Sequence, residues 1–277
     1  MKNHQNRSKP KLKSETMKFS AVFLLLVISL DVAALTMGEA INIAGRQRML
    51  SQRITQAYIL SGIQSDAQRH QKVLTRSVQE FERNNQKLGK FPAAEKIRNQ
   101  LEKVRKEWQA FKKISLQPVS KEGAAELFQR SNRLLSEAHI YVVKLQQLAN
   151  HNSAELINIA GRQRMLSQRI GKNYAAKIWG ISPEDAESGL HQDLVEYSNR
   201  LTQLLESPFN TPDINRNLQK AKDHLNYASR GFEGEMKISE KRQIQVITGT
   251  TDLMLRNMNV ITAQYAELLD SSETLIQ

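Results

Sequence analysis

Apolar residues recur every three or four positions through most of the chain after residue 36, which is the period of an α-helix with one buried face. Glycine and proline, which interrupt helices, are sparse at 12 and 6 of 277 residues. We see no convincing alternation of the kind that marks a β-strand. The pattern predicts an all-α protein with helices at residues 37–62, 66–89, 93–113, 121–149, 153–179, 183–206, 212–230 and 240–270.

Proline and capping residues mark several of the predicted helix ends. Ser182 before Pro183 combines a capping side chain with a first-turn proline. We predict a break at residues 150–152, where Asn152 and Glu155 resemble a capping pair. Four helices with short loops then predict an antiparallel four-helix bundle for each half of the chain. With the break, the first and fifth helices would run parallel and could lie side by side, whereas one continuous rod would keep them apart.

An internal repeat divides the chain. The fourteen residues 41–54, with the sequence INIAGRQRMLSQRI, return letter for letter at 157–170, while weaker matches such as Leu134 with Leu253 surround them. A duplicated fold needs only its apolar spacing, so the identical polar positions indicate a role that tolerates few alternatives. We predict two tandem, pseudo-symmetric units, of residues 37–152 and 153–277, each the size of an ordinary domain.

Residues 1–36 have the pattern of a targeting segment. Residues 1–18 carry six cations and one acid, and the apolar run 19–30 follows directly. That run is shorter than the roughly 20 residues that cross a bilayer, so we favour a signal peptide cleaved after Ala34. The alternative is an uncleaved anchor. In both cases the basic end would stay in the cytoplasm and the two repeats would be exported.

Composition excludes several kinds of function. The formal net charge of +12 falls to +7 without residues 1–18, and aromatic residues make up only 6%, so we expect no nucleic-acid partner. The absence of cysteine excludes disulfides and thiolate metal sites within the chain. Asp66 with His70 and Glu187 with His191 have the spacing of helical metal ligands, but surface pairing explains them better. We expect no metal, no cofactor and no enzyme activity, because no catalytic motif is present.

The repeated block offers a site for an anion. On the first predicted helix, Arg48 shares a face with the small residues Ala44 and Ser51, and Arg164 has the same setting in the second copy. If these faces meet, two guanidinium groups about 4 Å apart would repel by on the order of 4 kcal/mol, which favours a bound oxyanion. The candidate ligand-binding residues are Arg48, Arg164, Asn42, Asn158, Gly45, Gly161, Ser51 and Ser167. Serine and asparagine would supply neutral hydrogen bonds, and glycine would allow close approach.

A second interpretation of the arginines needs no ligand. A cation-rich helix is often a solvated face or is paired with acids on neighbouring helices. Glu80, Glu137 and Glu196 are available as partners of this kind. The sequence leaves both interpretations open.

The block INIAGRQRMLSQR resembles the signature at the start of the PilJ-type sensor domain of type IV pilus methyl-accepting chemotaxis transducers, which is related to NarX-like nitrate and nitrite sensors. The resemblance covers residues 37–277 and implies an extracytoplasmic four-helix bundle in the bacterial periplasm. In the nitrate sensors an arginine from each of two protomers holds one nitrate. By the motif this role falls on Arg48 and Arg164, here in one chain. The wording RQRMLSQR is closer to the pilus-transducer variant, for which nitrate is not implied.

Two functions follow from these observations. The first is a periplasmic or inner-membrane-anchored sensor module that binds a small oxyanion, nitrate or nitrite first. We see no HAMP-like linker, methyl-accepting coiled coil or kinase core, so we expect such a module to lack its own output domain. The alternative is a helical adaptor that docks a membrane-embedded signalling protein, a pilus or chemotaxis component, or a second copy of the chain as a homodimer.

Overall fold

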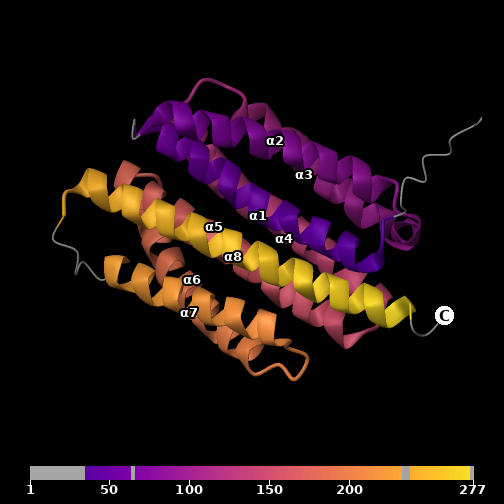
Figure 1. The fold of residues 1–277 in the computed structure, drawn as a ribbon. Coiled ribbons are helices and arrows are strands. Elements are labelled where there is room, and N and C mark those ends of the chain that lie inside the picture. The colour runs from indigo at the N-terminus through magenta and orange to yellow at the C-terminus, as the bar shows by residue number, and fades with distance from the viewer. Residues whose placement is uncertain (1–34, 64–65, 233–237, 275–277) are drawn as a thin grey trace, which may run out of the picture. The chain divides into compact units, whose positions relative to one another are not determined.

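The computed structural model describes residues 35–63, 66–232 and 238–274, which contain helices and no strand (Figure 1). In chain order the elements are α1 (Met37–Gly62), α2 (Ala67–Gly89), the 3₁₀ helix η1 (Pro92–Ile97), α3 (Arg98–Ser115), α4 (Lys121–Ala149), α5 (Asn152–Trp179), α6 (Pro183–Leu205), α7 (Pro212–Phe232) and α8 (Glu240–Thr274). The predicted all-α class is confirmed, and the helix ends lie within a few residues of their predicted positions. The predicted third helix is divided instead into η1 and α3.

The predicted break between the fourth and fifth helices is confirmed. Helix α4 ends at Ala149, and Asn150 has a left-handed backbone with φ 46°, which turns the chain out of the helix. The cap of α5 differs from the prediction. The side chain before the helix, His151, caps it by accepting a hydrogen bond at Nδ1 from the backbone N–H of Ser153. Asn152 is already inside α5, so its predicted capping pair with Glu155 is wrong.

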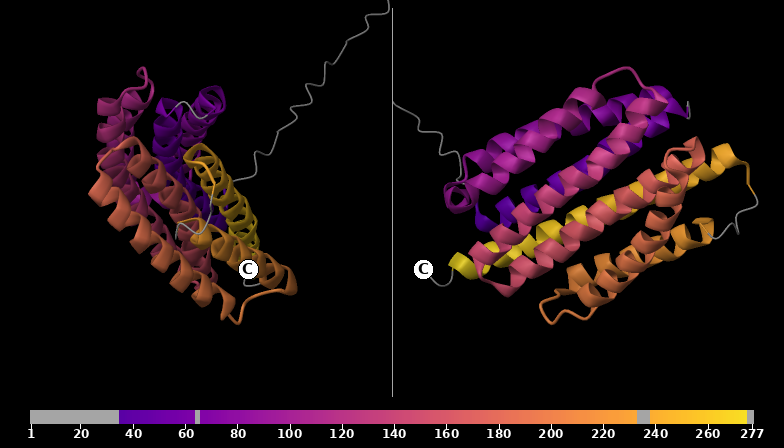
Figure 2. Two further views of the ribbon diagram at one scale, coloured as in Figure 1. Left: turned by 90° about the vertical axis from the view of Figure 1, so that its left-hand side faces the viewer. Right: turned by 180° about the vertical axis from the view of Figure 1, so that it is seen from behind.

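Helices α1 and α5 pack against each other over much of their length. Figure 2 shows the same helices from the side and from behind. Around them α2 and α4 pack on α1, while α6 and α8 pack on α5. Helices α3 and α7 complete the two bundles by packing on α4 and α8. The two bundles also contact each other through α1 and α8, so the described residues form one compact unit.

The two central helices run in the same direction. A Cβ added to Gly45 would lie 3.9 Å from the Cα of Gly161, and one added to Gly171 would meet Gln56 further along. Both pairs differ by about one repeat length, which is the signature of parallel helices in register. The predicted parallel arrangement of the repeated helices is therefore confirmed.

None of the described helices is both long and apolar enough to cross a membrane. The predicted leader lies outside the described residues, apart from Leu35 and Thr36. Thr36 forms a capping box with Glu39, in which each side chain accepts a hydrogen bond from the other residue's backbone N–H. Helix α1 thus begins at a defined local signal directly after the predicted leader.

Candidate functional site

The repeated arginines exchange hydrogen bonds between the two repeats. Arg48 on α1 donates from Nη1 to the side-chain oxygen of Asn158 on α5 at 2.7 Å, and from Nη2 to its backbone oxygen at 3.1 Å. Arg164 on α5 makes the same two bonds to Asn42 on α1, at 2.8 and 3.1 Å. Helical side chains lean toward the N-terminus, so each arginine reaches the asparagine nearly two turns earlier on the parallel neighbour. The identical polar residues therefore serve a contact between the repeats.

The two guanidinium groups meet where α1 and α5 approach most closely. A Cβ on Gly45 would lie 3.0 Å from Nη2 of Arg164 and 3.5 Å from Nη2 of Arg48. A Cβ on Gly161 would lie 3.0 Å from Nη2 of Arg48 and 3.3 Å from Nη2 of Arg164. The glycines thus leave room for both cations, and the predicted convergence of Arg48 and Arg164 is confirmed.

Both of these guanidinium groups are inside the protein. Arg48 is 1% exposed and Arg164 is 0% exposed. Their hydrogen-bond acceptors are neutral, and no carboxylate of the described residues forms an ion pair with either. Two like charges are therefore buried close together without a compensating acid, which is an expensive arrangement.

The other arginines of the block do have acidic partners. Arg46 pairs with Glu80 at 3.1 Å, and its counterpart Arg162 pairs with Glu196. Glu137, the third acid considered, accepts a hydrogen bond from Gln100. The salt-bridge interpretation is therefore right for the outer arginines of the block, and wrong for the central pair.

Burial sets the electrostatics of the central pair. It lowers the pKa of Arg48 to about 9, helped by the charge of Arg162 and opposed by Glu196. Burial also lowers the pKa of Arg164, and the charges of Arg46 and Arg48 act in the same direction. At pH 7 a group with a pKa of about 9 is still protonated, so Arg48 keeps its charge. Bound negative charge would raise both pKa values again.

Each central guanidinium has donors to spare. A guanidinium carries five N–H groups, and hydrogen bonds use two on Nη1 and one on Nη2 of each arginine. The Nε of Arg48 and that of Arg164 are buried and find no acceptor among the described residues. Nε and Nη2 are bonded to the same carbon, Cζ. The Nε–H and the second Nη2–H therefore form a two-pronged donor that matches two oxygens of a planar oxyanion.

Two further residues of this site were missed by the sequence analysis. His139 on α4 places Nδ1 3.2 Å from Nη1 of Arg48, and Asn259 on α8 accepts from Nη1 of Arg164 at 3.3 Å. The sequence matched Leu134 with Leu253, but Leu134 is buried and Leu253 is 43% exposed. Shifting the match by one residue, onto the fully buried Met254, aligns the buried positions of α4 and α8. That shift makes His139 and Asn259 counterparts, and the repeated block gave no signal for either.

His139 is neutral in this setting. Its pKa is lowered to about 4, chiefly by burial and also by the charges of Arg48 and Arg162, with Glu196 acting in the opposite direction. Arginine only donates hydrogen bonds, so Nδ1 of His139 must be the acceptor and its proton must lie on Nε2.

Replacing His139 with asparagine, its counterpart in the second repeat, should remove the contribution of His139 to the pH dependence of the free energy of unfolding. Histidine has a pKa of about 6.5 when unfolded and about 4 here, so between these values the unfolded chain binds more protons. The stability is complete above pH 6.5 and is lost as the pH falls toward 4, with a slope of at most about 1.4 kcal/mol per pH unit. Urea unfolding of both proteins from pH 4 to 7 measures this, and equal slopes in the two proteins would contradict the assignment.

The serines of the block have their hydroxyl protons engaged within their own helices. Ser51 donates to the backbone oxygen of Arg48 at 2.8 Å, and Ser167 donates to that of Arg164 at 2.7 Å. The amide nitrogen of Asn158 donates to Gln146 at 2.6 Å. These hydroxyl and amide donors are therefore engaged within the protein, whereas the buried Nε donors of Arg48 and Arg164 are not.

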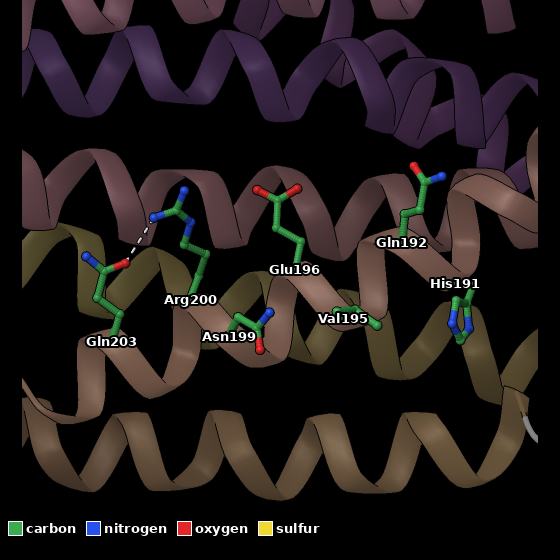
Figure 3. Close-up of a pocket in the computed structure, with 7 residues that line it drawn as sticks. All are labelled: His191, Gln192, Val195, Glu196, Asn199, Arg200 and Gln203. Atoms are coloured by element: carbon green, nitrogen blue, oxygen red, sulfur yellow. Dashed lines mark hydrogen bonds between the residues drawn. The ribbon is translucent and has the colours of Figure 1, made fainter.

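The surface depression in Figure 3 is not lined by Arg48 or Arg164. It has a volume of about 630 Å³ and is lined by His191, Gln192, Val195, Glu196, Asn199, Arg200 and Gln203. All these residues belong to α6, so no second helix brings chemical groups opposite them. We therefore assign no site to it. The residues that the structure describes contain no group of three metal-ligating side chains, and Glu187 pairs with Lys177.

Two packed four-helix bundles with one shared pair of arginines define a tandem helical module. The chain matches the family model PilJ, described as type IV pili methyl-accepting chemotaxis transducer N-term, over residues 33–134 and 148–237. The matched segments cover more than half of the chain, and each contains one copy of the repeated block. The chain therefore belongs to the PilJ family. No curated protein and no solved structure matches it.

Proposed function

We propose that this protein is an exported, sensor-type module that binds one small planar oxyanion, nitrate or nitrite first, between Arg48 and Arg164. The observation that carries the proposal is the pair of converging, fully buried guanidinium groups, whose acceptors are neutral and whose Nε donors have no acceptor among the described residues. An anion between them would reverse the sign of their mutual interaction and complete both hydrogen-bonding forks. The resemblance to nitrate sensors supports nitrate as the first ligand to test.

The setting of this module is also a proposal. The basic and apolar pattern of residues 1–36 favours export to the periplasm, by a cleaved leader or an anchor in the inner membrane. Membership of a family of chemotaxis transducer domains makes a membrane-embedded transducer or pilus component the favoured recipient of the signal. A change in the packing of α1 on α5 would be the means of transmission, because the arginines bond across that contact.

Thermal unfolding of the full chain with nitrate, nitrite, chloride and sulfate tests the proposal. Ligand at 100 times its dissociation constant stabilises a protein by about 2.7 kcal/mol, which raises the melting temperature measurably. We expect nitrate or nitrite to raise it, and chloride at the same ionic strength to have less effect. A melting temperature unchanged by every anion would contradict the proposal.

A docking function is the second candidate. Leu253 and Val260 are seven residues apart on α8, and so lie on one side of it, with exposures of 43% and 49%. Apolar side chains in that position suit a contact with another helix of a transducer, pilus component, sensor kinase or second copy of the chain. This function predicts that Leu253→Ser with Val260→Ser abolishes partner capture while the response to anions, if there is one, stays the same.

A further inference from the structure

Lys172 is a buried cation whose contacts are separate from those of Arg48 and Arg164. It lies on α5, is 1% exposed, and lines a cavity of about 460 Å³ between α4, α5 and α6. Its Nζ is 3.3 Å from Oγ of Ser131 and 3.4 Å from Oδ1 of Asn132, and it lies 4.3 Å from the centre of the Phe128 ring. These are long contacts for a buried ammonium group, whose three protons all require acceptors.

The acid nearest to Lys172 is already engaged. Asp193 on α6 is 1% exposed; its Oδ1 accepts from Arg169 and its Oδ2 accepts from Asn173 at 3.0 Å. No described carboxylate forms an ion pair with Lys172. Asp193 is therefore paired with Arg169, whereas Lys172 has no ion-pair partner of its own, and Asp185 is the other acid on the cavity wall.

The rest of the cavity is suited to a small polar molecule. Amide and hydroxyl side chains make up much of its wall, namely Gln129, Asn132, Asn173, Ser188 and Gln192. Its volume lies within the range of about 300–1,000 Å³ that small-molecule sites occupy. Three helices supply groups from different directions, in contrast to the depression on α6 in Figure 3.

We propose that this cavity is a second binding site, for a small carboxylate whose oxygen accepts a hydrogen bond from Nζ of Lys172. The amides of Gln129 and Gln192 supply donors for the remaining oxygens. We expect no second site of this kind, because the position equivalent to Lys172 in the first repeat is Gln56, a neutral residue. The Lys172 site stands independently of the oxyanion proposed between Arg48 and Arg164.

Protonation of Lys172 links binding to pH. The charged groups that face it are Arg169 from its own helix and Asp193 from α6, with Asp185 on the cavity wall, while α4 brings the neutral Phe128, Ser131 and Asn132. The pKa of Lys172 is lowered to about 7, chiefly by burial and also by the charge of Arg169, with Asp193 acting in the opposite direction. A bound carboxylate would raise this pKa, so binding takes up a proton between the two values and is tighter at pH 6 than at pH 8.

Titration calorimetry of the full chain with acetate, succinate and L-malate tests the site. We expect at least one of them to bind, and Lys172→Gln, the residue of the first repeat, to weaken it by about tenfold or more. At pH 8 the heat should differ between buffers of different ionisation enthalpy, because a proton is taken up. Ser188→Trp, a change of an exposed residue that fills the cavity, should abolish binding without altering the buried charges.

Several results would overturn the proposal. No heat from any of the three carboxylates would do so, as would unchanged affinity in Lys172→Gln or in Ser188→Trp. Should Lys172→Gln fail to fold, the Ser188→Trp protein decides the question. Equal heats in the two buffers at pH 8 would exclude Lys172 as the group that meets the carboxylate. Lys177→Gln is the matched control, since it changes an exposed lysine of the same helix that pairs with Glu187 and should leave carboxylate binding intact.

Discussion

Replacing Arg164 with glutamine is expected to remove the entire stabilisation by nitrate or nitrite, about 2.7 kcal/mol at 100 times the dissociation constant. Arg48→Gln should do the same, and the double variant should lose no more than either single variant, because one anion needs both guanidinium groups. Thermal unfolding with and without the anion measures all three. Equal, non-additive losses are the signature of a single site that the two repeats share.

The control for this series is Arg162→Gln. It removes an arginine of the same repeated block, but one that pairs with Glu196 and is only half-buried. We expect this variant to keep its full response to the anion. An anion response that survives in Arg48→Gln or Arg164→Gln would rule out the shared site, and so would an equal loss in the control.

We also expect a specific behaviour of the Arg48→Gln and Arg164→Gln variants when no anion is present. Each substitution removes a buried charge that repels the other arginine, and loses the two strong hydrogen bonds to the asparagine of the other repeat. Relief of a buried, uncompensated charge opposes that loss. The ligand-free variants are therefore expected to stay folded, which allows the loss of binding to be measured.

Replacing Trp108 with alanine is expected to lower the free energy of unfolding by about 3–5 kcal/mol. The ring of Trp108 is 0% exposed and stacks on Phe81, with 3.8 Å between ring centres and 10° between planes. Its Nε1 donates to Oε1 of Glu82 at 2.6 Å. The substitution would leave a cavity between α2 and α3, and Oε1 of Glu82 would lose one of its two donors and keep its bond from Lys112. Urea unfolding followed by circular dichroism measures the change.

Trp108→Phe separates the two contributions. It keeps an aromatic ring against Phe81 but cannot donate to Glu82, so we expect a smaller loss than that of Trp108→Ala. The two bundles form one compact unit, so a single unfolding transition is expected for both variants. A loss in Trp108→Ala of less than about 1 kcal/mol would show that the ring does not support the first bundle.

The amino-acid sequence determined most of the secondary structure. The spacing of apolar residues placed eight helices, and α1 and α4 have the predicted ends. Both the period of an α-helix and its end signals involve residues within a few positions of one another, so a single sequence contains them. The repeat also gave the parallel pairing of α1 and α5, because two copies of one helix in equivalent bundles point the same way.

The tertiary structure decided which residues complete each site. The sequence offered the meeting of Arg48 and Arg164 as one of two interpretations. It did not predict that each would bond to the asparagine of the other repeat, nor that His139 and Asn259 would take part. These contacts join residues about 90 to 120 positions apart. They depend on the register between helices and on the direction of long side chains, which no local pattern specifies.

Lys172 is a second example of a site that the sequence did not reveal and the tertiary structure did. As a sequence position it is one lysine that follows the repeated block, where the first repeat has Gln56. Only the packing of α4 and α6 on α5 buries its ammonium group, engages Asp193 with Arg169, and leaves a cavity beside it. Local spacing thus determined where the helices begin and end, whereas burial and charge pairing, which arise when distant helices meet, were decided by the tertiary structure.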